Sequence, residues 1–149
     1  MKGYIRYIDE CAMSVDRDVL YIMFHPEEQD NLEAFINAED KYDYKSDEIR
    51  DDVLSKITDM GVQYWPCFCY PTIVGGGVWR GEVCLDVPHD PKNKLYKKVN
   101  DYFENKDGTM KIESVRFCYY PISAAKYASK QFDDLIMSSQ DVQFVTDTK

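Results

Sequence analysis

The sequence predicts an α+β protein: an antiparallel sheet of the ferredoxin-like, split βαβ type, with helices on one face and additions at both ends of the chain. Two observations lead to this class. Apolar residues switch between strand and helix spacing along the chain, and from residue 18 to residue 120 the expected elements run β-α-α-β-β-α-β. An acetyltransferase-like α/β arrangement has a similar element order and is the alternative.

Composition supports a packed core. The chain has 149 residues, of which 44% are hydrophobic and 14% aromatic. A chain of this length buries about two-thirds of its unfolded surface. No repeat, low-complexity tract or Pro/Gly linker divides it, so we expect one globular domain, residues 1–149.

The first half is expected to contain two strands and then two helices. These elements are strands at 3–8 and 18–24, a helix begun by Pro26, and a helix capped by Ser46 and ended by Gly61. The run at 18–24 is apolar on both faces, which is typical of a central strand. The second helix repeats apolar residues at helical spacing from Ile49 to Met60, so its acids should face solvent.

The second half is expected to begin with a hairpin. The expected elements are strands at 62–73 and 78–87, a helix from Pro91 to Asp107-Gly108, a strand at 110–120, a helix begun by Pro121, and a short edge strand at 142–145. Gly75-Gly76-Gly77 predicts a tight turn between the first two strands. In the second of them Arg80, Glu82 and Asp86 alternate with apolar residues, so these three are expected to face solvent.

The negative charge lies in the first 60 residues. They hold 16 Asp and Glu against 7 Lys and Arg, whereas residues 61–149 hold 11 of each, and the whole chain carries a net charge of −9. Such a field attracts cationic surfaces and repels nucleic acid. We therefore expect no direct binding of nucleic acid.

The N-terminus carries Arg6, Asp9 and Glu10 where a secretory signal needs an apolar run, and no stretch approaches the ~20 apolar residues of a membrane span. The five cysteines are odd in number and lie in or beside apolar segments, which is typical of free thiols in a reducing compartment. The expectation is a cytoplasmic protein that does not bind membranes.

These observations favour a protein that acts by binding another protein. Carboxylates on rigid helices can pair with the Lys and Arg residues of a basic, nucleic-acid-binding or catalytic cleft and occlude it. Toxin immunity proteins and phage inhibitors of host nucleases are two classes that work in this way. The expected contact residues are Glu28, Glu39, Asp40, Tyr42, Asp43, Tyr44, Asp47, Glu48, Asp51 and Asp52.

The only basic cluster is Lys92, Lys94, Lys97 and Lys98 on the solvent side of an amphipathic helix. Lysines in this position are expected mainly to make the exposed side of the helix soluble. The cluster also allows a homo-oligomer, in which this helix meets the acidic face of a second copy.

Two alternative functions involve a small-molecule ligand. A ferredoxin-like domain could hold a small molecule near Trp65, Asp86 and His89. His25 and His89 each follow a strand and were expected at the same edge of the sheet, but they lack the partners and spacing of a metal or catalytic motif. Cys67 and Cys69 form a CxC pair, but the sequence has no second pair of ligands that would complete a zinc site with them. No metal or cofactor is therefore expected.

The other alternative is an acyl-CoA-dependent transferase. Its usual R/Q-x-x-G-x-G/A loop should fall where the sequence has Val87-Pro-His-Asp-Pro-Lys-Asn, without a glycine. No catalytic residues can be assigned from the sequence.

Overall fold

A computed structural model describes residues 4–26, 42–75 and 79–147, with the backbone alone for residues 139–147. Five strands form one open, mixed sheet in the order β1-β3-β4-β2-β5. The strands are β1 (Arg6–Tyr7), β2 (Val19–Phe24), β3 (Tyr64–Phe68), β4 (Val83–Leu85) and β5 (Val115–Tyr120). The α-helices in these ranges are α1 (Ile8–Val15), α4 (Glu48–Asp59), α5 (Lys94–Phe103) and α6 (Ile122–Asp147). The expected α+β class is confirmed.

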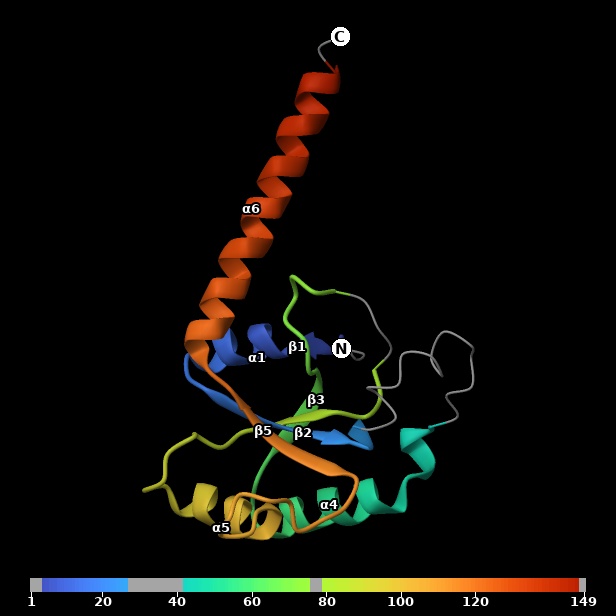
Figure 1. Cartoon of the computed structure of the whole chain (residues 1–149), viewed down its shortest axis with the longest axis vertical. Helices are drawn as coiled ribbons and strands as arrows, with labels where there is room; N and C mark the ends of the chain where they lie inside the picture. Colours follow the sequence, from blue (N-terminus) through green and yellow to red (C-terminus); the bar gives the residue numbers. More distant parts are fainter. Residues whose placement is uncertain (1–3, 27–41, 76–78, 148–149) are drawn as a thin grey trace.

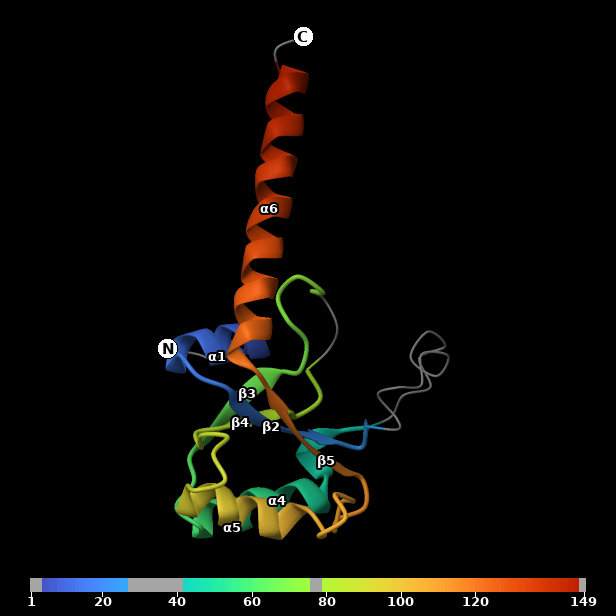
Figure 2. The same ribbon diagram turned by 60° about the vertical axis from the view of Figure 1, so that its left-hand side comes forward.

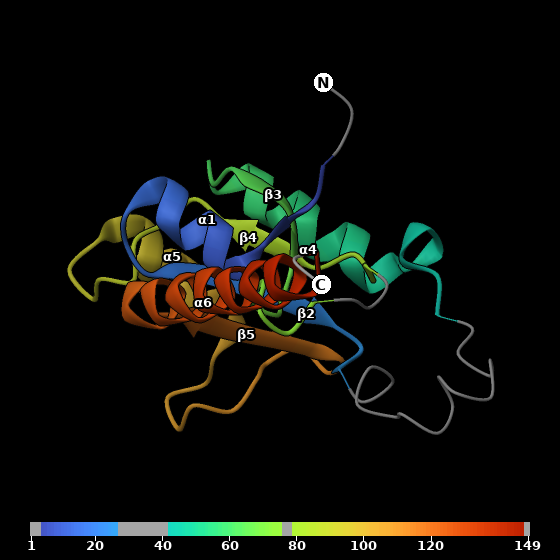
Figure 3. The ribbon, with the colours of Figure 1, turned by 90° about the horizontal axis from the view of Figure 1, so that it is seen from above.

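Helices cover both faces of the sheet (Figure 1). α4 and α5 lie against one face. α1 and α6 lie against the other, next to each other when the sheet is viewed from their side (Figure 3). The sequence predicts helices on one face only, because it predicts no helix between the strands expected at 3–8 and 18–24.

β2 is an inner strand, with a neighbour on each side, as its apolar run predicts. It pairs antiparallel with β4 over Leu20–Ile22 and with β5 over all six of its residues. β4 in turn pairs antiparallel with β3. β1 pairs parallel with β3 at the edge, so the sheet is mixed rather than wholly antiparallel.

The alternation of β2 divides the interior into two cores. Leu20, Ile22 and Phe24 point into the α4–α5 core, which also contains Phe103 of α5. Val19 points into the α1–α6 core. The buried members of that core are Ile8, Cys11, Ala12, Val19, Cys67, Cys84 and Ala125. Because successive side chains of a strand point to opposite faces, β2 contributes residues to both cores.

Of the strand expected at 3–8, only Arg6–Tyr7 forms a strand among the described residues, and α1 begins directly after it at Ile8. Ile8, Cys11, Ala12 and Val15 have the i, i+3, i+4, i+7 spacing of a helix, and Ile8, Cys11 and Ala12 are buried. A Tyr7–Glu10 capping box closes the N-terminus of the helix. This spacing was visible in the sequence.

The antiparallel pairing around the glycine-rich segment is confirmed, but both strands are shorter than the expected 62–73 and 78–87. The register pairs Tyr64 with Leu85, so a long connection, residues 69–82, separates β3 from β4. Residues 76–78 lie outside the described part of the chain. β4 is buried on both faces and Glu82 is 3% exposed, so the expected solvent-facing Glu82 is wrong.

The two α4–α5 helices begin at different residues from those predicted. Asp47, not Ser46, caps α4, and α5 starts at Lys94 behind the cap Asn93 rather than at Pro91. Each cap accepts a hydrogen bond from a backbone N–H of the first turn, the role that these side chains favour. The helix expected from Pro26 falls on residues 27–41, outside the described residues.

α6 is longer than predicted. It begins after Pro121, where Asp18 accepts a hydrogen bond from the backbone N–H of Ile122, and continues to Asp147. The edge strand expected at 142–145 is therefore wrong, and those residues are helical. α6 leaves the domain as a straight rod in both side views (Figure 2). Among the described residues, no helix is both long and apolar enough to cross a membrane.

Candidate functional site

α4 carries a stripe of carboxylates on its solvent side. Val53, Leu54 and Ile57 are buried against the sheet, and this fixes the rotation of the helix. Glu48, Asp51 and Asp52 consequently lie on the exposed side, as the sequence predicts. These three residues are named the acidic face of α4. Acids in the first turn also interact favourably with the helix dipole.

The carboxylates of the acidic face of α4 are not paired with basic side chains of the described residues. Within the ranges that the structure describes, no ion pair joins its carboxylates to a Lys or Arg. Arg50, on the same helix, is turned away: its Nε donates to the carbonyl of Gly81 at 2.9 Å. Its guanidinium lies 5.2 Å from the centre of the Tyr44 ring and 5.8 Å from that of Trp79. Cation–π contacts therefore engage this cation. The other basic residue of α4, Lys56, is exposed one turn after Asp52 and forms no ion pair with a described residue.

Asp47 does not belong to this face, which corrects the expectation that it faces solvent. Its side chain is 5% exposed and accepts hydrogen bonds from the Tyr42 hydroxyl at 2.7 Å and the Ile49 N–H at 3.0 Å. The His25 Nε2 lies 3.0 Å from the same oxygen that Tyr42 reaches. Burial alone would raise the pKa of Asp47, but these bonds outweigh it and hold the pKa below its ordinary value.

The two tyrosines expected as exposed anchors are half-buried. Tyr42 packs against His25, with 4.7 Å between ring centres, and Tyr44 against Trp79 at 4.6 Å. Burial, followed by the bond to Asp47, raises the pKa of Tyr42. Asp43 is exposed and caps the short helix η1 (Tyr44–Ser46) through the Lys45 N–H. The expected contact residues Glu28, Glu39 and Asp40 lie outside the described residues.

Trp65, Asp86 and His89 each contact a different partner among the described residues. Trp65 donates its indole N–H to the Cys11 sulfur at 3.2 Å. Asp86 pairs with Arg17 at 2.7 Å. His89 stacks on Tyr119, with 4.4 Å between ring centres, and its Nδ1 is 4.0 Å from Asp18.

The two histidines were expected at one edge of the sheet, and this is wrong. β2 and β4 are antiparallel, so His25 and His89, which follow these strands, lie at opposite ends. His25 contacts Asp47 at the start of α4. His89 contacts Asp18 at the start of β2. No shared acid–base site results.

Four cysteines are buried and Cys118 is half-buried, all as free thiols. Hydrogen bonds from Cys67 and Cys84, together with that from Trp65, lower the pKa of Cys11. The contact with Cys11 raises the pKa of both Cys67 and Cys84. No group of His, Cys, Asp or Glu in the described ranges could hold a metal ion.

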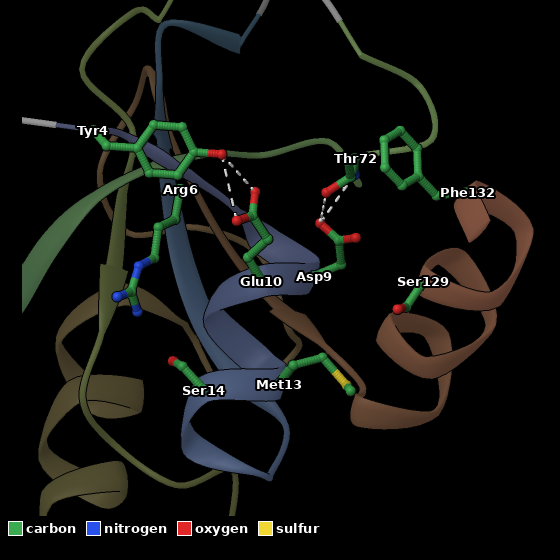
Figure 4. A pocket seen from close by; sticks show the side chains of 9 residues that line it. All are labelled: Tyr4, Arg6, Asp9, Glu10, Met13, Ser14, Thr72, Ser129 and Phe132. Carbon is green, nitrogen blue, oxygen red and sulfur yellow. Dashed lines mark hydrogen bonds between the residues drawn. The ribbon is translucent and has the colours of Figure 1, made fainter. Parts of the chain in front are cut away.

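A groove that the sequence did not indicate lies between α1, the β3–β4 connection and α6 (Figure 4). Its volume is about 840 Å³. Its lining comprises Tyr4, Arg6, Asp9, Glu10, Met13, Ser14, Thr72, Ser129 and Phe132. These residues come from three distant segments, so only the packing of α6 on α1 creates the groove.

Comparison with known proteins gives no relative: no family model, curated protein or solved structure matches the chain.

Proposed function

We propose that this protein acts by binding a basic protein partner through the acidic face of α4, as an inhibitor that occludes a cationic cleft. The observation that carries the proposal is that Glu48, Asp51 and Asp52 are exposed without an ion pair among the described residues, while Arg50 is held inward by Gly81 and by aromatic rings. An unpartnered stripe on a rigid helix is suited to a surface rich in Lys and Arg.

The mechanism would be electrostatic steering followed by occlusion. Residues three or four apart on a helix have their Cβ atoms about 5–6 Å apart, so the carboxylates of Glu48, Asp51 and Asp52 can meet one basic patch at once. The net charge of −9 attracts such a patch from a distance and repels nucleic acid. Because the carboxylates are exposed, salt should weaken the association.

The buried network supports the same proposal indirectly. Asp47, Tyr42 and His25 tie the chain before α4 to the end of β2, and Asp47 also caps the helix. The acidic face is therefore presented on a helix whose start is fixed. Rigid presentation lowers the entropy lost on binding.

For the fold, we propose that β2 to β5 form a ferredoxin-like split βαβ core to which β1, α1 and α6 are added. The supporting observations are the order β3-β4-β2-β5, the antiparallel pairing of these four strands, and the position of α4 and α5 on one face. The acetyltransferase-like alternative requires a strand that splays from its neighbour. β4, which leads to His89, pairs on both sides.

We also propose a cytoplasmic location, which the five free thiols support. Three of them, Cys11, Cys67 and Cys84, contact one another in the α1–α6 core. A reducing compartment keeps such a cluster from forming disulfides.

The test is a pulldown from host lysate at low and high salt with the tagged protein and a triple variant, Glu48→Lys, Asp51→Lys and Asp52→Lys. We expect a basic protein to be captured at low salt and lost at high salt. The triple variant should lower the affinity for the purified partner at least tenfold, because three attractive contacts become repulsive.

The matched control is Asp101→Lys, Asp133→Lys and Asp134→Lys, which changes three exposed acids on α5 and α6. Both variants alter the net charge from −9 to −3, since each of three substitutions adds two charges. Equal loss in the two variants would reduce the effect to net charge, and undiminished capture by the first would refute the proposal. Circular dichroism melts verify that both variants fold.

A further inference from the structure

The groove between α1, the β3–β4 connection and α6 contains a buried carboxylate. Asp9 is 3% exposed, and its Oδ1 accepts hydrogen bonds from the Thr72 N–H and hydroxyl, both at 3.0 Å. Its Oδ2 receives no hydrogen bond from any described residue, although the atom is not sealed from the groove. In Figure 4 this second oxygen points across the groove toward α6. A carboxylate oxygen that faces a groove from a largely buried side chain is suited to accept a hydrogen bond from a cationic donor.

The remaining wall is largely apolar. Met13 is 44% exposed and Phe132 is 36% exposed, although both are large hydrophobic side chains. Tyr4 closes the opposite side, with its hydroxyl 3.1 Å from Glu10. Exposed apolar side chains that gather around one concave site mark a binding surface more often than isolated ones do.

The charges of the groove are separated along its length. Figure 4 places Glu10 between the Arg6 guanidinium and Asp9, so the end of the groove near Thr72 is negative. Glu10 is already engaged, because it accepts from Tyr4 and from the Tyr7 N–H. Asp9 is therefore the carboxylate with an unused oxygen, and it lies on the α1 wall with Met13, across the groove from Phe132 of α6.

From this geometry we propose that the groove binds a small organic cation with an apolar body. The positive group would bind Oδ2 of Asp9, and the apolar part would cover Met13 and Phe132. A volume of about 840 Å³ lies within the range of small-molecule sites. The site is separate from the acidic face of α4, which lies on the other side of the sheet (Figure 1).

Three probes of similar shape test the charge selectivity: phenethylammonium, the neutral 2-phenylethanol and the anionic 3-phenylpropionate. Each is titrated into the ¹⁵N-labelled full chain, and amide shifts are followed by NMR. We expect phenethylammonium to shift the amides of Asp9, Met13 and Thr72, with weaker shifts from the alcohol and none from the anion.

Asp9→Asn removes the charge and leaves an amide oxygen that can accept from Thr72, so the fold should be retained. We expect it to weaken phenethylammonium at least tenfold and to leave 2-phenylethanol unchanged. Phe132→Ala alters an exposed side chain and should weaken both probes. Asp101→Asn on α5 is the matched control and should change neither.

Equal binding of cation and alcohol, or unchanged cation binding in Asp9→Asn, would overturn the cation site. Shifts confined to residues outside the groove would do the same. These outcomes are independent of the pulldown, because neither the acidic face of α4 nor its control residues line the groove.

Discussion

The two faces of the sheet are packed with different side chains. Among the described residues, the α4–α5 core has 14 buried members, all of them Leu, Ile, Val or Phe. The α1–α6 core has seven, and five of these are Cys or Ala. The first face leaves no large apolar side chain of α4 or α5 exposed, whereas the second leaves Met13, Phe132 and Leu135 at the surface.

This difference suggests that the α4–α5 side mainly stabilises the fold, whereas the α1–α6 side provides the candidate ligand site. Large side chains bury more apolar area, and each contributes about 1.5–3 kcal/mol when fully buried. We therefore expect most of the folding free energy on the α4–α5 side. The α1–α6 side has a thinner core, and its unfilled edge is the groove beside Asp9.

The strongest test compares one phenylalanine from each side. Phe103 is fully buried and stacks on Phe117 with 4.9 Å between ring centres. Phe103→Ala should lower the free energy of unfolding by about 3–5 kcal/mol, because it removes apolar contacts and leaves a cavity. Phe132→Ala should cost less than about 1 kcal/mol, as is usual for exposed positions. Urea unfolding measures both, and equal losses would refute the proposed division.

A smaller effect concerns the support of the acidic face. Gly81 has φ of +88°, and an added Cβ would lie 2.6 Å from the Tyr44 Cβ and 2.8 Å from the Arg50 Nε. Gly81→Ala should cost about 1–3 kcal/mol, through strain and through displacement of Arg50. Gly108→Ala has a similar φ of +85° with no neighbour within 4 Å, so it isolates the backbone strain. A loss no greater at Gly81 than at Gly108 would contradict close packing around Arg50.

The smallest effect compares two buried carboxylates, one on each face. Asp47→Asn should cost about 1–2 kcal/mol at neutral pH, since it weakens the bonds from Tyr42, His25 and the helix start. Asp9→Asn should cost less, because its amide oxygen still accepts from Thr72.

The Asp47 effect should depend on pH. The pKa of Asp47 is lowered from 3.8 in the folded protein, so its contribution is present above pH 3.8 and is lost as the pH falls through the lower folded value. The difference between wild type and Asp47→Asn in urea unfolding should therefore shrink in acid. A difference that is constant with pH would exclude an ionised Asp47 as its cause.

The sequence predicted those features that depend on local pattern. The inner position of β2 followed from its apolar run, the exposure of Glu48, Asp51 and Asp52 from the helical spacing of Val53 and Ile57, and the free thiols from their apolar surroundings. Helix α1 was missed although its spacing was present, because its eight residues are short and adjoin a strand-like run. The helical state of residues 142–145 was missed because Val142 and Val145 fit a short strand as well as a helix.

Tertiary structure alone decided which polar side chains remain available. Asp47 and Glu48 are adjacent acids in the sequence, yet one is a buried cap and the other is exposed, because His25 and Tyr42 reach Asp47 from other segments. Arg50 would have offset the acids of α4, but Gly81 and Trp79, about 30 residues away, hold it inward. The groove likewise depends on α6 lying against α1, and no periodicity of a single segment encodes such a contact between distant ones. What the sequence by itself determined was the α+β class, the inner strand β2 and the charge of α4, since each follows from neighbours along the chain.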